Sequence, residues 1–282
     1  MLYRYKAIVE YDGTYFCGWQ RQISDESAIF PGSNRIASTQ CCNDTTQYSG
    51  VPPALNSVSS VPSVQGTIEK ALKKITSHRI LVEGAGRTDA GVHATNQVAH
   101  FDLPSGIKPE KLQLGLNFYL QPFCAAIVKL EEVAPTFHAR FSAKARQYEY
   151  HIVNRPAPLT IRKNRAWHVS VPLDISIMQK AAGAFVGCHN FNSFRAAECQ
   201  SANPIKTIDS FEILLLDGEI IGKVQAKSFL HNQVRIMMGT LVLMGKRKIS
   251  SEIIPELLKA EDRSAAGPTA PAYGLYLTGV LY

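Results

Sequence analysis

The sequence has 282 residues, of which 45% are hydrophobic and 19% charged, so the chain can bury a sizeable core and is not globally disordered. It contains 30 Lys and Arg against 23 Asp and Glu, and its net charge of +7 favours a polyanionic partner. No apolar run approaches the roughly 18 residues of a membrane span, and the N-terminus lacks a signal-peptide apolar region. We therefore expect neither a secreted, nor a membrane, nor a fibrous protein.

Six cysteines are scattered along the chain, and none forms a C-x-x-C pair. The adjacent Cys41 and Cys42 have poor geometry for sharing a metal, and no H-E-x-x-H element is present. Thiols in a chain without a secretory signal are reduced by default. We therefore expect a cytoplasmic protein that uses neither disulfides nor a metal.

The first half of the chain mixes strands and helices. Tyr3–Tyr11 alternates between two faces and predicts a strand with one wetter face. A helical spacing of apolar residues begins at Val64, and Ser63 is placed to cap this helix. The other predicted elements of this half are a short strand over 80–83, a strand over 97–103, a helix opened by Pro109 and a strand over 124–133.

The second half shows a similar order. The predicted elements are a strand over 145–153, a helix capped by Asp174, a hairpin of 207–216 and 219–229 across Asp217-Gly218, helices over 232–245 and 251–260, and a strand over 275–281. Two halves of this kind indicate a duplicated α+β domain. We predict an N-terminal half over residues 1–134 and a C-terminal half over residues 135–282.

The segment Ile23–Ser63 differs from the rest of the chain. Of its 41 residues, 21 are Ser, Asn, Thr, Pro or Gly, and its net charge is −2. A connection of this length without periodicity is usually disordered or functional. We expect disorder, and the alternative is a flexible flap over a substrate.

The stretch Gly84–His93 is the most informative one. Its glycines permit unusual backbone angles and the close approach of a ligand. Arg87 and Asp89 lie two positions apart, and a neighbouring Arg favours the ionised carboxylate, which can act as a nucleophile or a base. A tight turn with a structural ion pair explains the same residues equally well. The glycine spacing does not match a dinucleotide fingerprint.

Two further stretches carry basic residues in informative places. From Ala139 to Arg165 there are seven Lys and Arg and one acid. Basic residues interleaved with Tyr148 on a strand suit backbone neutralisation and base stacking, and the alternative is a solvated face with core tyrosines. Arg235 lies in the first turn of a buried helix, where it needs an anionic partner unless it reaches solvent.

These stretches belong to a series of motifs that spans nearly the whole chain. The motifs are Glu10–Gln22 (EYDGTYFCGWQRQ), Val64–Leu72 (VQGTIEKAL), Gly86–Ala94 (GRTDAGVHA), Ala145–Tyr150 (ARQYEY), Phe191–Cys199, Phe229–Gly239 and Ala270–Leu275. The GRTDAGVH element is highly specific. In these motifs and their order the chain resembles the TruA-type tRNA pseudouridine synthases, which act on the anticodon stem-loop.

The resemblance implies roles for four residues. Asp89 matches the nucleophilic aspartate of the family, and Tyr148 matches the tyrosine that stacks on the target base. Arg235 matches the arginine that pairs with the aspartate, and Arg87 matches one implicated in flipping the target out. The resemblance also implies tRNA uridines 38 to 40 as targets, no cofactor and no metal. It further implies a homodimer and two pseudo-symmetric halves that share one long antiparallel sheet with a central cleft.

The main departure from the family is the insertion Ile23–Ser63, which makes this connection about 35 residues longer than usual and leaves substrate handling open. The residues also leave open whether Asp89 attacks C1′, attacks the base or abstracts a sugar proton. Two other functions compete with the isomerase. One is a non-catalytic RNA-binding protein, and the other is a metal-free hydrolase that uses Asp89.

Overall fold

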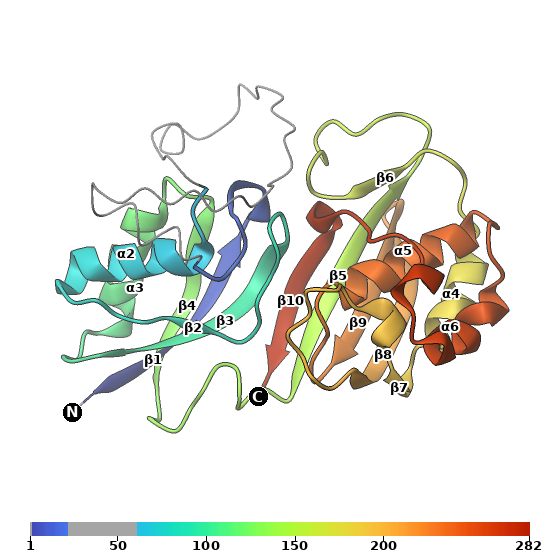
Figure 1. Cartoon of the computed structure of the whole chain (residues 1–282). Coiled ribbons are helices and arrows are strands. Elements are labelled where there is room, and N and C mark those ends of the chain that lie inside the picture. Colours follow the sequence, from blue (N-terminus) through green and yellow to red (C-terminus); the bar gives the residue numbers. More distant parts are fainter. Residues whose placement is uncertain (1, 22–60) are drawn as a thin grey trace, which may run out of the picture.

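The computed structural model describes residues 2–21 and 61–282, in which ten strands form one sheet that carries five α-helices (Figure 1). The strands are β1 Tyr3–Tyr11, β2 Glu83–Gly84, β3 His93–Leu103, β4 Ala125–Val133, β5 Ala145–Asn154, β6 Trp167–Val169, β7 Gly187–Asn190, β8 Ile205–Leu216, β9 Glu219–Ala226 and β10 Leu275–Leu281. The helices are α2 Val64–Thr76, α3 Pro109–Leu120, α4 Ile175–Gly183, α5 Gln233–Gly245 and α6 Ile254–Ala260. None of these helices combines the length and the apolar character needed to cross a membrane. Of the insertion Ile23–Ser63, residues 23–60 lie outside the described residues.

The strands follow the order β4-β1-β3-β10-β5-β9-β8-β7, with β2 beside β3 and β6 beside β5. The pairings are antiparallel except for β10 with β3 and β5 with β6, which are parallel. The predicted α+β class and the predicted long antiparallel sheet are therefore confirmed, with these two parallel pairings as the departure. The last strand of the chain, β10, lies in the middle of this sheet and joins its two ends.

Local sequence signals place several elements where we predicted them. β1 buries Tyr5 and Val9 on one face and exposes Glu10 on the other, which confirms the alternation. Ser63 caps α2, because its hydroxyl accepts a hydrogen bond from the Gly66 N–H (3.1 Å).

The second half of the chain follows the same rule. Asp174 caps α4 by accepting a hydrogen bond from the Ile177 N–H (3.2 Å). β8 and β9 form the predicted hairpin, and Asp217 and Gly218 both have positive φ (51° and 79°). This backbone is that of a two-residue turn of the primed type, which Asp-Gly favours. β9 ends at Ala226, earlier than predicted.

In the first half of the chain, β2 and β3 also depart from their predicted bounds. The strand predicted over 80–83 is reduced to β2, because the Val82 N–H donates to the Glu69 carboxylate of α2 (3.1 Å) instead of to a strand. β3 begins at His93 instead of Gln97, because its first residues pair with β10, where His93 lies opposite Tyr276.

Two hydrophobic clusters fill the space between helices and sheet. One contains side chains of α2, α3, β1 and β3, and the other contains side chains of α4, α5, α6, β5, β8 and β9. Leu277 of β10 belongs to the first cluster and Leu275 to the second. Residues two apart on a strand share a face, so both groups of helices cover the same face of the sheet. Figure 1 shows α2 and α3 over one end and α4 to α6 over the other.

Candidate active site

A cavity of about 1370 Å³ lies where the two halves of the chain meet. It is lined by residues of the segments 85–92, 140–148, 198–201 and 227–235, which come from both halves of the chain. Tyr148 of β5 lines the cavity and pairs with Leu277, and its ring packs against both hydrophobic clusters. The cavity therefore opens on the helix-covered face, where β10 and β5 join the two ends of the sheet.

The Asp89 carboxylate lies in this cavity between the side chains of Arg235 and His231. Its Oδ2 is 3.2 Å from Nη1 of Arg235, and its Oδ1 is 3.2 Å from Nε2 of His231. The carboxylate is 32% exposed. Arg235 donates a hydrogen bond to Oδ2, and the His231 imidazole lies within ion-pair distance of Oδ1, so the direction of the carboxylate is held.

Arg235 is itself oriented by the first turn of α5. Its Nη1 also donates to Oδ1 of Asn232 (2.6 Å), and its Nε donates to the Ala270 carbonyl (2.8 Å). Asn232, which precedes α5, has a left-handed backbone with φ of 61°. The guanidinium therefore faces the carboxylate, with 16% of its side chain exposed, rather than extending into solvent.

The loop that carries Asp89 is held by the segment after β1. The Thr88 hydroxyl lies 2.8 Å from the Tyr11 hydroxyl, and the Thr88 carbonyl accepts a hydrogen bond from the Trp19 N–H (3.0 Å). Gly18 forms a bridge with Asp89 and has φ of +113°. A Cβ at Gly18 would lie 2.6 Å from the Thr88 carbonyl oxygen, so this close approach requires glycine.

Tyr148 presents its ring to the same cavity. The ring lies edge-on to Phe229 with centroids 5.3 Å apart. Burial raises the pKa of Tyr148 to about 12; Arg146 opposes this rise and Asp89 adds to it. The phenol is therefore neutral at physiological pH and offers a flat apolar surface with one hydroxyl.

Arg87 lies exposed at the edge of the cavity. Its Nη1 donates to Oε1 of Gln200 (3.0 Å), a contact that joins the Asp89 loop to the segment 198–201. The arginine that pairs with Asp89 is thus Arg235 from the other half of the chain, and not its neighbour Arg87.

The basic residues between Ala139 and Arg165 do not behave alike. Arg146 is buried and donates to the backbone carbonyls of Ala85 (2.8 Å), Arg140 (2.7 Å) and Lys227. It joins three segments that line the cavity, so its role is structural. The prediction that this stretch neutralises a backbone is therefore wrong for Arg146, because its guanidinium points into the protein.

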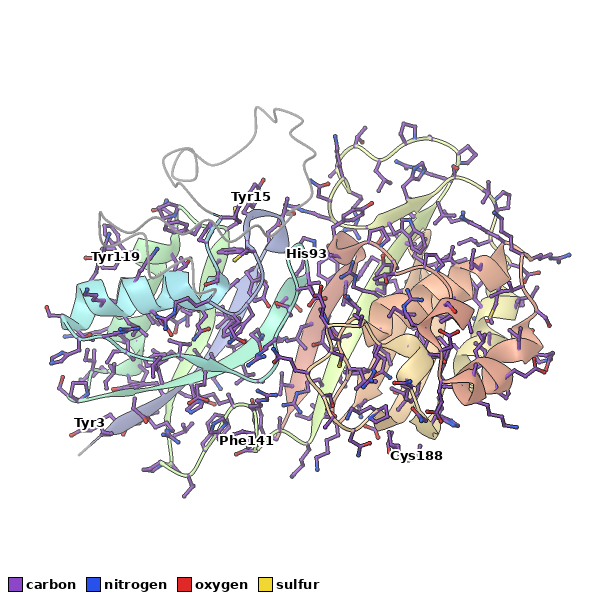
Figure 2. The ribbon with its side chains drawn as sticks, in the orientation of Figure 1. Tyr3, Tyr15, His93, Tyr119, Phe141 and Cys188 are labelled. Atoms are coloured by element: carbon purple, nitrogen blue, oxygen red, sulfur yellow. The ribbon has the colours of Figure 1, made fainter. Side chains whose placement is uncertain are left out.

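The loop between β5 and β6 carries exposed basic groups. Arg162 pairs with Glu219, and Arg165 pairs with Asp12 (3.3 Å) while leaving 56% of its side chain exposed. His93 holds this loop from the centre of the molecule (Figure 2). Its Nδ1 lies 3.0 Å from the Gly13 nitrogen and 3.1 Å from Oδ1 of Asp12. Its Nε2 lies 3.0 Å from the Asn164 carbonyl and 3.1 Å from the Tyr273 carbonyl.

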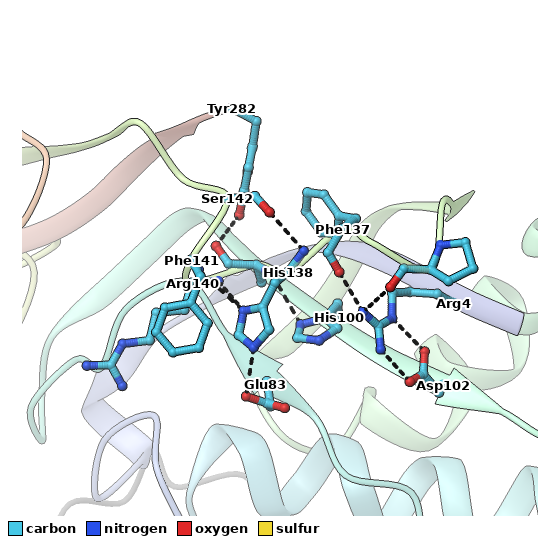
Figure 3. A network of polar contacts seen from close by, with 12 residues as sticks. Arg4, Glu83, His100, Asp102, Phe137, His138, Arg140, Phe141, Ser142 and Tyr282 are labelled. Atoms are coloured by element: carbon cyan, nitrogen blue, oxygen red, sulfur yellow. Dashed lines mark hydrogen bonds and ion pairs between the residues drawn. The ribbon is translucent and has the colours of Figure 1, made fainter. Parts of the chain in front are cut away.

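A second polar cluster has the composition of a metal site. Among the described residues, Glu83, His100 and His138 bring their ligand atoms within 4.8 Å of one another (Figure 3). Nδ1 of His100 accepts the Ala139 N–H (3.3 Å), and Nδ1 of His138 accepts the Arg140 N–H (3.1 Å). A neutral imidazole has one lone pair in its ring plane, so both Nε2 atoms carry hydrogens. The cluster is a hydrogen-bonded support and not a set of metal ligands.

His231 is the contact of Asp89 that the sequence analysis missed. It lies four positions before Arg235, a separation that on a helix would place both side chains on one face. α5 begins only at Gln233, however, so the turn at Asn232 brings His231 to the carboxylate. The four-residue spacing between His231 and Arg235 was the sequence signal for this contact. It would have suggested that both residues lie on one helix, but His231 precedes the helix.

Comparisons with known proteins identify the family of this chain. The family model described as tRNA pseudouridine synthase matches residues 181–282. The protein named tRNA pseudouridine synthase A of Paramagnetospirillum magneticum is 44% identical over 279 residues, which cover 99% of this chain and 95% of that protein. The protein of the same name from Anaplasma phagocytophilum is 45% identical over 279 residues, which cover 99% of this chain and 100% of that protein.

Proposed function

Because this chain belongs to the tRNA pseudouridine synthase A family, we propose that it isomerises uridine to pseudouridine in tRNA. The targets are uridines 38, 39 and 40 of the anticodon stem-loop, and Asp89 is the nucleophile. The observation that carries this proposal is the Asp89 carboxylate held between Arg235 and His231 in a cavity that Tyr148 also lines.

The reaction exchanges one bond to the sugar for another. The N1–C1′ bond of the uridine breaks, the base turns, and C5 forms the new bond to C1′. The hydrogen on C5 leaves as a proton, and N1 gains one. A carboxylate suits the breaking of a glycosidic bond, because it stabilises or captures positive charge at the anomeric carbon. Arg235 and His231 support this by holding the Asp89 carboxylate in place in the cavity.

The target must first leave its stack, which costs a few kcal/mol. Tyr148 receives the extruded uracil on its ring, whose neutral state follows from its raised pKa. Arg87 occupies the space that the base vacates. Its exposed position at the edge of the cavity supports this role, since its contact with Gln200 can be exchanged for one with RNA.

The proposal also assigns a role to each half of the chain. The N-terminal half, residues 1–134, supplies the Asp89 loop, and the C-terminal half, residues 135–282, supplies the Tyr148 strand and the Arg235 helix. The protein acts in the cytoplasm as a homodimer. Light scattering at several protein concentrations tests the dimer.

One assay tests the activity directly. A tRNA transcript labelled with tritium at C5 of uridine should release tritium in step with the pseudouridine found after digestion. Replacing uridines 38, 39 and 40 one at a time by cytidine should remove the product at each position. Binding without release would favour the RNA-binding protein, and release of free base without pseudouridine would favour the hydrolase.

A further inference from the structure

The loop between β4 and β5 exposes an aromatic ring at the edge of the active-site cavity. Phe141 is 78% exposed, and it lines the cavity together with Arg140 (Figure 2). An exposed phenylalanine ring forgoes the free energy that burial would give it, and because Phe141 stands at the cavity, a molecule bound there can cover it.

The backbone beneath this ring is held by His138 (Figure 3). Nδ1 of His138 accepts the N–H groups of Arg140 (3.1 Å) and Phe141 (3.3 Å). The Ser142 hydroxyl accepts the His138 N–H (3.0 Å), and the Ser142 N–H donates to the His138 carbonyl (2.9 Å). The turn is therefore closed on itself, with Glu83 opposite Nε2 of the same imidazole (3.3 Å).

The turn is also fixed to the rest of the protein. The Tyr282 hydroxyl donates to the Ala139 carbonyl (2.7 Å), and Arg146 donates to the Arg140 carbonyl (2.7 Å). The same guanidinium donates to the Ala85 carbonyl (2.8 Å), at the start of the Asp89 loop. The position of Phe141 is thus tied to the loop that carries the nucleophile.

The Phe141 ring has two planar neighbours, the His138 imidazole and the Arg140 guanidinium. The imidazole of His138 lies 4.5 Å from that of His100 and 4.3 Å from the Phe141 ring, between centroids. On the other side, the Arg140 guanidinium carbon lies 5.9 Å from the centre of the Phe141 ring. An exposed aromatic ring beside a cation is the combination with which proteins stack on unpaired bases and approach the adjoining phosphate.

We propose that Phe141 is a stacking platform for an unpaired nucleobase of the RNA, next to the nucleotide that enters the cavity, with Arg140 at the adjoining phosphate. This inference rests on the proposed tRNA substrate, which it deepens by assigning a base subsite outside the reaction centre. The positive lining of the cavity, which includes Arg87, Arg140 and Lys227, favours a nucleic acid over an apolar protein surface as occupant.

The test compares Phe141→Ala and Phe141→Trp with Phe118→Ala, which removes another ring that is 71% exposed but lies on α3 outside the cavity. The affinity for tRNA is measured at several salt concentrations. Phe141→Ala should weaken binding about 5- to 150-fold, the range for loss of one base stack. Phe141→Trp should restore it, and Phe118→Ala should leave it unchanged.

Two readouts separate stacking from a structural role. The slope of log affinity against log salt should be the same for Phe141→Ala and wild type, because stacking releases no counterions. A 2-aminopurine placed beside the target nucleotide should be quenched by wild type and not by Phe141→Ala. Light scattering and thermal unfolding of each variant show whether assembly and fold are unchanged.

Failure of the platform and failure of the proposed function give different results. Wild-type affinity in Phe141→Ala, together with pseudouridine formation by wild type, would overturn the platform alone. Loss of affinity in Phe141→Ala, with tRNA bound but not converted by wild type, would support the platform and overturn the isomerase. Equal losses of tRNA affinity in Phe141→Ala and Phe141→Trp would also count against a stacking role.

Discussion

The carboxylate of Asp89 and the guanidinium of Arg235 meet at 3.2 Å although 146 positions separate them in the sequence. Asp89 comes from the loop before β3, and Arg235 from the first turn of α5. Since β10 is the strand that joins the two ends of the sheet, the distance between these two groups depends on the packing of the whole molecule.

Replacing the nucleophile tests the chemistry with the least change in shape. Asp89→Asn should lower turnover more than about a thousandfold, because an amide can neither attack nor accept a proton as a carboxylate does. Thermal unfolding and tRNA affinity should change little. Residual turnover within tenfold of wild type would remove Asp89 from the role of nucleophile.

His231 should contribute through Asp89 and not independently. His231→Ala removes the imidazole that lies 3.2 Å from Oδ1, and we expect the turnover number to fall about tenfold with little change in KM. His231→Gln, which can still donate, should recover part of this loss. In the Asp89→Asn background, His231→Ala should have no further effect, and an additive loss would show a separate role.

Two glycines with positive φ provide a matched pair. Gly18→Ala should destabilise the fold by about 1–3 kcal/mol and lower turnover at least tenfold, because the new Cβ would push Thr88 and the Asp89 loop away. Gly218→Ala in the β8–β9 turn meets no atom within 4 Å, so it should cost about 1 kcal/mol and leave turnover unchanged. Urea unfolding and single-turnover kinetics measure both. Equal turnover in the two variants would contradict the close-approach argument.

The exposed basic residues of the β5–β6 loop should contribute to the salt dependence of tRNA binding. The triple variant of Arg162, Lys163 and Arg165 to Ala should make the slope of log affinity against log salt less negative by about 2. Lys180→Ala on α4, where the ammonium pairs with Glu252, is the matched control and should leave the slope as it is. An unchanged slope in the triple variant would place the phosphate contacts elsewhere.

The raised pKa of Tyr148 predicts a loss of stability at high pH. Burial raises this pKa from 10.0 to about 12, so the folded state retains a proton that the unfolded chain releases. The contribution of the protonated Tyr148 phenol to the free energy of unfolding is complete below pH 10 and decreases as the pH rises from 10 towards 12. Tyr148→Phe should show a shallower decrease in the free energy of unfolding over this range, with a constant difference from wild type below about pH 9. Parallel curves up to pH 11 would show that the folded phenol titrates normally.

Elements with local signals were predictable from the sequence. Alternation over Tyr3–Tyr11, the caps at Ser63 and Asp174, and the Asp217-Gly218 turn depend on neighbours within a few residues. Residue types and motif spacing likewise singled out Asp89, Tyr148, Arg87 and Arg235, because carboxylates, aromatics and arginines have restricted chemistry wherever they lie.

Tertiary contacts decided what these signals left open. The backbone of residues 80–82 lost its strand because Glu69 of α2 accepts the Val82 N–H. The basic Arg146 turned inward because the carbonyls of Ala85, Arg140 and Lys227 surround it. Residue types alone left open which arginine pairs with Asp89, although the family resemblance implied Arg235. The pairing with Arg235 and the addition of His231 to the site required both ends of the sheet to be joined through β10. Local sequence sets the conformations a segment prefers, whereas which of two arginines reaches a carboxylate is set by distances across the folded chain.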